Sequence, residues 1–291
     1  MAVWNLGSIN IDNVYRVPHL PAPGETLSAV AFSQGLGGKG ANMSVAIARA
    51  AARVAHIGAV GPDGKWTVER LLEYGVDTRR IAEMVDQATG HANISVAEDG
   101  ENQIVLFSGS NRAISDQLIG SALAEAAAGD TFLTQNETNG QRTGAEMAKQ
   151  LGLKVVYAAA PFDAQAVRDI LPFIDLLVLN QVEAEQLEEA LGKPVHALGI
   201  ADVVVTLGAD GCLWLQSSGE ETHVPAIQVT PVDTTGAGDT FTGYLVAGLD
   251  RGMPMRQALG LATQAGALMV TRLGTADVIP DLKEIEDAKL A

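Results

Sequence analysis

A regular alternation of short apolar runs and longer amphipathic segments restricts the possible folds of this chain more than any other feature. The short runs beyond Ser115 are rich in Val, Ile and Leu, as in strands that are buried on both faces. Strands that alternate with helices predict a mainly parallel central sheet with helices on both faces. We expect helices over 115–128, 141–151, 164–171, 181–191, 237–249 and 254–270, and strands over 130–134, 153–158, 174–179 and 202–207.

The first third of the chain interrupts this alternation. After a strand expected over 3–7, two pairs of short apolar-rich runs are each joined by a turn-forming segment. The runs cover 14–17 and 27–32 in the first pair, and 92–97 and 103–107 in the second. We expect both pairs to form one small sheet, which packs over the main sheet or against a second subunit.

The length and the composition predict a single α/β domain over residues 1–291. Apolar residues make up 47% of the chain, which is enough for one large core. Further elements are expected over 41–52 (helix), 54–60 (strand) and 66–74 (helix). The runs 212–215 and 221–224 predict a hairpin, which would add antiparallel strands at one edge of the sheet.

The net charge of −16 argues against nucleic acid and anionic membranes as partners. The single cysteine, Cys212, excludes an internal disulfide and a cysteine-based metal site. The N-terminal residues lack the basic flank and the apolar segment of a signal peptide, and no apolar run approaches the ~18 residues that span a bilayer. We therefore expect a soluble protein of the cytoplasm.

The most informative short stretch is Asp233-Thr-Thr-Gly-Ala-Gly-Asp239, where we expect a strand to end at Val232 and a helix to begin. Gly236 and Gly238 permit a tight turn, and the free N–H groups of a helix start can bind an anion such as a phosphoryl group. Asp239 would direct its carboxylate at this anion, as phosphoryl transfer to a hydroxyl requires. The alternative is that Asp239 only caps the helix and the glycines only turn the chain.

A second glycine-rich run contains Gly35, Gly37 and Gly40 in the spacing G-x-G-x-x-G of dinucleotide-binding proteins. That motif joins the first strand directly to its helix, whereas here the first predicted strand pair lies between them. A dehydrogenase is therefore disfavoured, and no P-loop sequence occurs. The run can instead form a floor for a small ligand, with Asn42 as hydrogen-bond donor and acceptor.

Polar residues near the ends of predicted strands are candidate ligand contacts. Asn10 and Asp12 suit the hydroxyl groups of a sugar-like ligand, and Glu137 follows a buried strand from which it could reach the same ligand. The alternative for these three residues is an ordinary role in a turn or a solvated loop.

Two further stretches each have a structural and a functional interpretation. Asn180 and Glu183 either cap a helix as a pair or lie beside the water shell of an Mg²⁺ ion. The stretch Thr206-Leu-Gly-Ala-Asp-Gly211 is either the start of a plain hairpin or a turn that nucleotide phosphates can approach closely.

Six motifs, in this order, resemble those of the ribokinase-like (PfkB) carbohydrate kinases, and within the family they are most similar to the ribokinase branch. They are Gly7-Ser-Ile-Asn-Ile-Asp12, Pro21-Ala-Pro-Gly-Glu-Thr26, Gly37-Gly-Lys-Gly-Ala-Asn42, Asn180-x-x-Glu183, Thr206-Leu-Gly208 and Asp233-Thr-Thr-Gly-Ala-Gly-Asp239. The resemblance implies a ribokinase-like fold in which segments of about 12–33 and 92–108 form a lid over the sugar. In ribokinase-type enzymes the lid also forms the dimer contact, so the resemblance implies a homodimer that associates through the lid.

The resemblance also implies a role for each matching residue. Asp239 would be the general base for the primary hydroxyl of the sugar, and the N–H groups of Gly236, Ala237 and Gly238 would hold the γ-phosphoryl group. The residues implied to bind the sugar are Asn10, Asp12, Gly38, Lys39, Asn42, Glu137 and Asp239. Those implied to bind ATP are Asn180, Thr206, Gly208, Gly211, Gly238 and Thr263, with Glu183 holding Mg²⁺ through water.

A monovalent cation, K⁺, is implied near the phosphoryl pocket as well. Its ligands would come from Asp233, Thr235, Met269, Arg272 and Gly274. Val278 departs from the family pattern, because ribokinases offer a hydroxyl ligand at that position, and this weakens the case for K⁺. Tyr244 is a second departure, because a small residue usually follows the glycine that Gly243 matches.

These implications describe an ATP- and Mg²⁺-dependent sugar kinase, with D-ribose as the leading substrate and ribose 5-phosphate as the product. Kinases of nucleosides, fructose or 2-keto-3-deoxygluconate are alternatives within the family. A nucleoside would need a stacking aromatic residue, and the lid offers few candidates beyond Tyr15, Phe32 and Phe107. From a different class, a sugar-binding sensor without catalysis is disfavoured because Asp239 and its glycines are all present.

Overall fold

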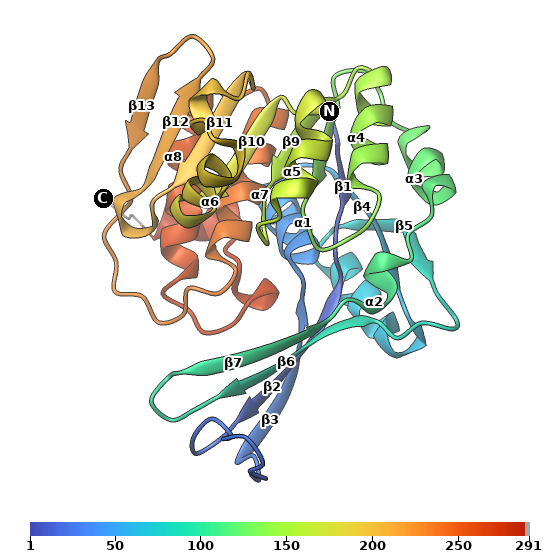
Figure 1. The fold of residues 1–291 in the computed structure, drawn as a ribbon, viewed down its shortest axis with the longest axis vertical. Coiled ribbons are helices and arrows are strands. Elements are labelled where there is room, and N and C mark those ends of the chain that lie inside the picture. The colour runs from blue at the N-terminus through green and yellow to red at the C-terminus, as the bar shows by residue number, and fades with distance from the viewer. Residues whose placement is uncertain (289–291) are drawn as a thin grey trace.

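The computed structural model describes residues 1–288 and contains a central sheet of nine strands. These are β1 (Val3–Leu6), β4 (Val54–Val60), β5 (Asp77–Glu83), β8 (Thr131–Thr134), β9 (Lys154–Ala158), β10 (Leu176–Asn180), β11 (Asp202–Thr206), β12 (Cys212–Gln216) and β13 (Glu221–Val224). Their order is β13-β12-β11-β10-β9-β8-β1-β4-β5 (Figure 1). The strands from β11 to β5 run parallel, and the predicted hairpin of β12 and β13 adds two antiparallel strands at one edge.

The direction in which strands are added to the sheet reverses at β1, which lies between β8 and β4. Loops that leave the carboxyl ends of strands at such a point diverge and open a crevice, where ligands bind in open α/β sheets. Ser8 follows β1 and Glu137 follows β8, so both residues lie at this crevice.

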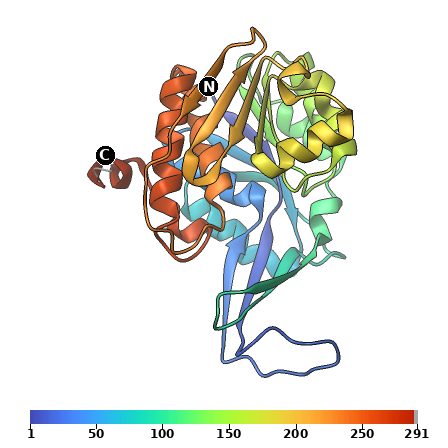
Figure 2. The ribbon, with the colours of Figure 1, turned by 60° about the vertical axis from the view of Figure 1, so that its left-hand side comes forward.

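Helices cover both faces of the sheet (Figure 2). They are α1 (Lys39–Arg49), α2 (Lys65–Glu73), α3 (Asp116–Leu123), α4 (Gln141–Gln150), α5 (Ala164–Ile170), α6 (Gln181–Leu191), α7 (Ala237–Asp250), α8 (Met255–Met269) and α9 (Leu282–Asp287). Single 3₁₀ turns cover Pro62–Gly64, Gly109–Arg112, Leu171–Phe173, Val195–Ala197, Gly208–Asp210 and Ala276–Val278. Among residues 1–288, no helix is both long and apolar enough to cross a membrane.

The sheet separates two apolar cores, because successive side chains of a strand point to opposite faces. Val3 of β1 belongs to the core under α1, α2, α7 and α8, whereas its neighbour Trp4 belongs to the core under α3, α4, α5 and α6. The prediction of a mainly parallel sheet with helices on both faces is confirmed.

A separate sheet of four strands projects from the body of the molecule (Figure 1). Its strands are β2 (Asn10–Arg16), β3 (Ala31–Gly37), β6 (Gly90–Val96) and β7 (Asn102–Phe107), in the order β3-β2-β6-β7. The two predicted strand pairs do join into one sheet, but the strands of the first pair have different bounds. Gly35 and Gly37 lie in β3, opposite Asp12 and Asn10, because the pairing with β2 outweighs the low strand propensity of glycine.

Other elements also differ from the prediction. The strand expected to end at Val232 does not form, because no strand lies in the described residues between β13 and α7. The helix expected over 115–128 ends at Leu123. Strand β5 was not predicted, because its sequence DTRRIAE is mostly polar, as an edge strand permits. Helix α9 was also missed; it starts with a capping box in which the side chains of Asp281 and Glu284 each accept the other's backbone N–H.

Candidate active site

The site is built around the start of α7. Gly236 precedes the helix with φ 75° and ψ 1°, a left-handed conformation that glycine adopts without strain. The N–H of Ala237 donates to the carbonyl of Thr234 at 3.2 Å. The N–H groups of Gly236 and Gly238 have no acceptor within residues 1–288, so these two amides are available to an anion.

Asp239 lies in the first turn of α7 with 7% of its surface exposed. Its Oδ2 accepts a hydrogen bond from Asn42 Nδ2 at 2.9 Å. Burial raises the pKa of this carboxyl above its ordinary value, although the Lys39 ammonium and the Asn42 hydrogen bond act in the opposite direction. Asp239 in turn raises the pKa of Lys39. A buried carboxyl with a raised pKa beside a cation is suited to general-base chemistry.

The side chain of Asn42 has one hydrogen-bonding atom to spare. Its Nδ2 is committed to Asp239, whereas its Oδ1 is buried and has no partner in the described part of the chain. Buried polar atoms are normally satisfied, so this oxygen is a candidate acceptor for a hydroxyl group of a ligand.

Glu137 connects the loop after β8 to the start of α1. Its Oε2 accepts hydrogen bonds from the backbone N–H of Lys39, at 3.0 Å, and from the hydroxyl of Ser8. Ser8 Oγ also accepts from the Gly40 N–H at 3.2 Å. Gly38, which precedes α1, has φ 93° and so relies on the freedom of glycine. Sequence reasoning did not single out Ser8, whose only signal was its place inside the first motif.

Asn10 and Asp12 lie two residues apart on β2 and therefore on the same face of the small sheet. Asp12 packs over Gly37, where an added Cβ would lie 2.1 Å from Asp12 Oδ2. Burial, together with the negative charges of Glu137 and Asp239, raises the pKa of Asp12 to about 7. Three acidic side chains thus converge on one space, and hydroxyl groups of a ligand are the donors that would satisfy them.

Two cavities adjoin at the start of α7. The first has a volume of about 240 Å³, and its charged and amide-bearing lining residues are Lys39, Asn180, Glu183 and Asp239. The second has a volume of about 270 Å³ and extends toward α8. Thr206, Thr234 and Gly238 line both cavities, so a ligand in one can reach a ligand in the other.

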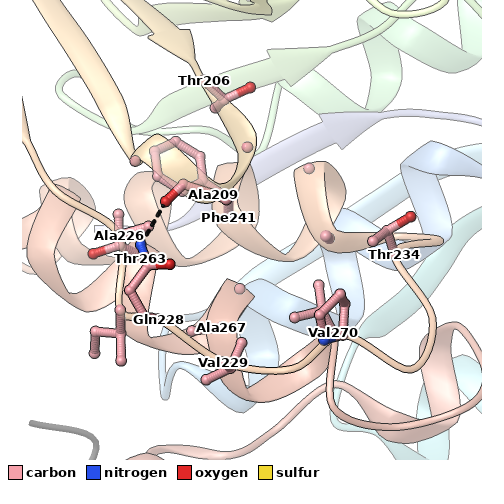
Figure 3. A pocket seen from close by; sticks show the side chains of 17 residues that line it. Thr206, Ala209, Ala226, Gln228, Val229, Thr234, Phe241, Thr263, Ala267 and Val270 are labelled. Atoms are coloured by element: carbon pink, nitrogen blue, oxygen red, sulfur yellow. Dashed lines mark hydrogen bonds between the residues drawn. The ribbon is translucent and has the colours of Figure 1, made fainter.

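The second cavity is largely apolar (Figure 3). Five of the six residues predicted to bind ATP line it, namely Thr206, Gly208, Gly211, Gly238 and Thr263, whereas Asn180 lines the first cavity. Ala226, Gln228 and Phe241 line it as well, and Gln228 Nε2 donates to the carbonyl of Ala209 at 2.9 Å. The sequence did not single out these three residues. Ala226 and Gln228 belong to a segment without a motif, and Phe241 lies just after the motif that ends at Asp239. An apolar slot of this kind suits a flat aromatic base.

Asn180 and Glu183 form the predicted cap at the start of α6. Each backbone N–H donates to the side chain of the other residue at 2.8 Å. The pKa of Glu183 is raised above its ordinary value by burial, and the Lys39 ammonium offsets part of this effect. Within residues 1–288, no group of three or more His, Cys, Asp or Glu side chains could hold a metal directly. The cap occupies Glu183 Oε2 and leaves Oε1 free, so Oε1 is the oxygen that would hold a water of an Mg²⁺ shell.

Asp233 joins the turn before α7 to the loop after α8. Its carboxylate accepts hydrogen bonds from the N–H groups of Thr235, at 2.9 Å, and Gly274, at 3.3 Å. The carbonyl of Met269 accepts from the Arg272 N–H at 3.0 Å at the end of α8. The predicted cation ligands therefore lie on two connected loops. Val278 faces Gly274 with hydrocarbon only, since an added Cβ on Gly274 would lie 3.4 Å from Val278 Cγ1.

The structure accounts for the unusual Tyr244. Its side chain is fully buried in α7, and its hydroxyl donates to the carbonyl of Pro280 at 2.6 Å. The bond links the helix that carries Asp239 to the segment that leads into α9. Burial raises the pKa of this phenol, so it stays protonated and able to donate.

Comparison with known proteins agrees with this geometry. Residues 3–282 match the model of the pfkB family of carbohydrate kinases. A ribokinase of Haemophilus influenzae is 38% identical over 96% of this chain and 95% of its own length. A deoxyribokinase of Salmonella typhi is 29% identical over 99% of this chain and 98% of its own.

Among solved structures, the Arabidopsis thaliana ribokinase complexed with ribose and ATP has a TM-score of 0.85. Its sequence is 28% identical, and the match covers 99% of this chain and 98% of that one. The family match extends over nearly the whole chain, and it includes β1, both cavities and the start of α7. The protein therefore belongs to the pfkB family of carbohydrate kinases.

Proposed function

We propose that this carbohydrate kinase transfers the γ-phosphoryl group of ATP to the primary hydroxyl of D-ribose and releases ribose 5-phosphate. The observation that carries the proposal is that Asp239 lies between the two kinds of site: it lines a cavity that adjoins the apolar slot, and it is bonded to Asn42 and acts electrostatically on Asp12. Phosphoryl transfer needs a nucleotide, an acceptor hydroxyl and a base to meet at one point. ATP as the donor favours a cytoplasmic location for the enzyme.

In this proposal Asp239 is the general base. Asn42 holds Oδ2, so Oδ1 takes the proton of the sugar hydroxyl. The N–H groups of Gly236 and Gly238 stabilise the negative charge of the phosphoryl oxygens. Mg²⁺, when bound, supplies neutralisation of phosphate charge, and Glu183 orients its water shell.

The sugar occupies the space between β2 and α1. The free oxygens of Asp12, Glu137 and Asn42 accept hydrogen bonds from its hydroxyl groups. The names of the relatives favour a pentose, and both ribokinases and a deoxyribokinase are among them. The 2-hydroxyl group is therefore the feature on which substrate choice should be tested.

We further propose that the small sheet is a lid that also forms a homodimer. Every residue of β7 is exposed, including the apolar run Ile104–Phe107, and Phe32 of β3 is exposed as well. Apolar surface of this extent on a monomer marks an interaction site. Light scattering should give the mass of a dimer, and Leu106→Glu should give a monomer.

The proposed K⁺ site lies on the loops before α7 and after α8. The loops that carry Asp233 and Gly274 are connected, but Val278 contributes carbon atoms to them. If the loop binds K⁺, replacing this ion by tetramethylammonium at constant ionic strength should depress kcat. Equal rates in the two salts would show that K⁺ plays no part.

The experiment that tests the function is ATP consumption by the purified protein with Mg²⁺ and a panel of acceptors. The panel holds D-ribose, 2-deoxy-D-ribose, D-fructose, 2-keto-3-deoxygluconate and nucleosides. We expect the highest kcat/KM with D-ribose. A higher value for another acceptor would reassign the substrate, and silence of the wild type with every acceptor would refute the kinase assignment.

A further inference from the structure

The last strand of the lid re-enters the body through the turn Gly109–Arg112, and this turn is bonded to β4, to the segment around Glu137 and to the start of β2. Ser110 Oγ donates to the carbonyl of Ala59 in β4 at 2.9 Å. Arg112 donates to the carbonyls of Asn136, at 3.4 Å, and Thr138, at 2.7 Å, on either side of Glu137. Asn111 lies between them and is 1% exposed.

The side chain of Asn111 is fully engaged with the start of β2. Its Oδ1 accepts from the N–H of Ile9 at 3.0 Å. Its Nδ2 donates to the carbonyl of Ile9 at 3.2 Å and to Asn10 Oδ1 at 2.7 Å. The two bonds to the Ile9 backbone fix which end of the Asn111 amide is the donor. This donor then fixes the amide of Asn10.

The consequence concerns the atom that Asn10 presents to a ligand. Oδ1 of Asn10 accepts the hydrogen bond from Asn111, so the atom of Asn10 that remains free for a ligand is Nδ2. Within residues 1–288, Asn10 Nδ2 donates no hydrogen bond. Asp12 lies on the same face of β2 and can only accept when it is ionised. A hydroxyl that donates its proton to Asp12 still needs a donor for its oxygen, and Asn10 Nδ2 is that donor.

We propose that Asn111 is a positioning residue, which sets the amide of Asn10 so that it donates to an oxygen of the sugar. The proposal rests on the proposed function, in that Asn10 is taken to contact the sugar. Gly90, which faces Asn10 across the β2–β6 pair, leaves room for this arrangement. An added Cβ at Gly90 would lie 2.1 Å from Asn111 Nδ2 and 2.5 Å from Asn10 Oδ1.

The first test is the variant Asn111→Ala, assayed with the best acceptor of the wild type. The apparent KM for the sugar should rise at least tenfold, while the KM for ATP and kcat at saturating sugar stay within about twofold. Sugar binding measured by calorimetry without ATP should weaken by the same factor. Ser110→Ala is the matched control, because it removes a buried bond of the same turn that does not reach Asn10. Its sugar KM should stay unchanged.

A double-mutant cycle distinguishes positioning through Asn10 from a loss of structure. In an Asn10→Ala background, the substitution Asn111→Ala should change the sugar KM by less than about twofold. Gly90→Ala should reproduce the loss of affinity while Asn111 is still present, and it keeps the test valid if Asn111→Ala does not fold.

An unchanged sugar KM in both Asn111→Ala and Gly90→Ala, or an effect of Asn111→Ala that is equally large without Asn10, would overturn the inference. Failure of the proposed function would be seen separately, as a wild type that phosphorylates no sugar, and it would remove the basis of the inference as well.

Discussion

The dependence of sugar binding on pH tests the site through a single carboxyl group. Burial raises the pKa of Asp12 from 3.8 to about 7, and the charges of Glu137 and Asp239 add to the effect. Sugar hydroxyls donate to the ionised carboxylate, so protons compete with the sugar below this pKa. We therefore expect the apparent affinity for the sugar to fall as the pH falls from 8 to 6.

The size of the effect follows from the titration of one group. The apparent dissociation constant is multiplied by 1 + 10^(pKa − pH), which is about 1.1 at pH 8, about 2 at pH 7 and about 11 at pH 6. Binding should therefore weaken roughly tenfold between pH 8 and pH 6. With the ordinary pKa of 3.8, the change over this range would be below about 1%.

The same shift predicts how the stability of the free enzyme depends on pH. The folded pKa of Asp12 lies above its unfolded value, so the folded state binds more protons and its stability falls as the pH rises from about 4 to 7. A shift from 3.8 to about 7 corresponds to a loss on the order of 4 kcal/mol at pH 8. Asp12→Asn should therefore be more stable than the wild type at pH 8, and the difference should shrink toward pH 4.

The assay is calorimetric titration of the sugar without ATP at constant ionic strength from pH 6 to 8, so the ionisation of ATP does not interfere. Chemical denaturation at the same pH values gives the free energy of unfolding. Asp12→Asn is the control, because it keeps the shape of the side chain but removes its ionisation. A dissociation constant of the wild type that is constant across this range would refute the reasoning.

Three further predictions follow from other contacts of the site. Asp239→Asn should lower kcat by about 10²–10⁴-fold with sugar affinity nearly retained, and near-normal turnover would remove Asp239 as the base. Gly37→Ala should weaken sugar binding, because its Cβ would displace the Asp12 carboxylate, whereas Gly35→Ala on the same strand meets no atom within 4 Å and should bind normally; equal binding by both would contradict this. Tyr244→Phe should lower the free energy of unfolding by about 1 kcal/mol, because it removes one buried hydrogen bond. Denaturant titration measures this loss, and an unchanged midpoint would show that the bond does not stabilise α7.

Much of the fold could be predicted because its elements are recorded in local patterns. Apolar runs such as those of β9 and β10 are buried on both faces, so their composition alone marks them as parallel strands. Strand β5 carries no such pattern, because its polar residues are tolerated only at an edge of the sheet. Gly37 could not be assigned to a strand from the sequence either. Glycine has a low strand propensity, and its strand conformation here depends on the pairing with β2.

The candidate site was predictable where the residues that shape the backbone and the residues that carry the chemistry lie within a few positions of each other. Gly236 and Asp239 stand three positions apart. The glycine permits the left-handed turn at which the helix starts, and the aspartate supplies a base beside the anion-binding N–H groups of that start. Asn111 could not be found in this way. It lies 101 positions from Asn10, and its role comes entirely from the hydrogen bonds that bring the turn after β7 to the start of β2.

By itself, the sequence determined the alternation of strands and helices, the anion-binding start of α7 and the residue types that a sugar kinase needs, because these depend on short-range periodicity and turn chemistry. Only the tertiary structure decided how Asp12, Glu137 and Asp239 share one buried space. Their mutual charge and loss of water raise the pKa of Asp12, and such long-range terms exist only when β2, β8 and α7 are packed together.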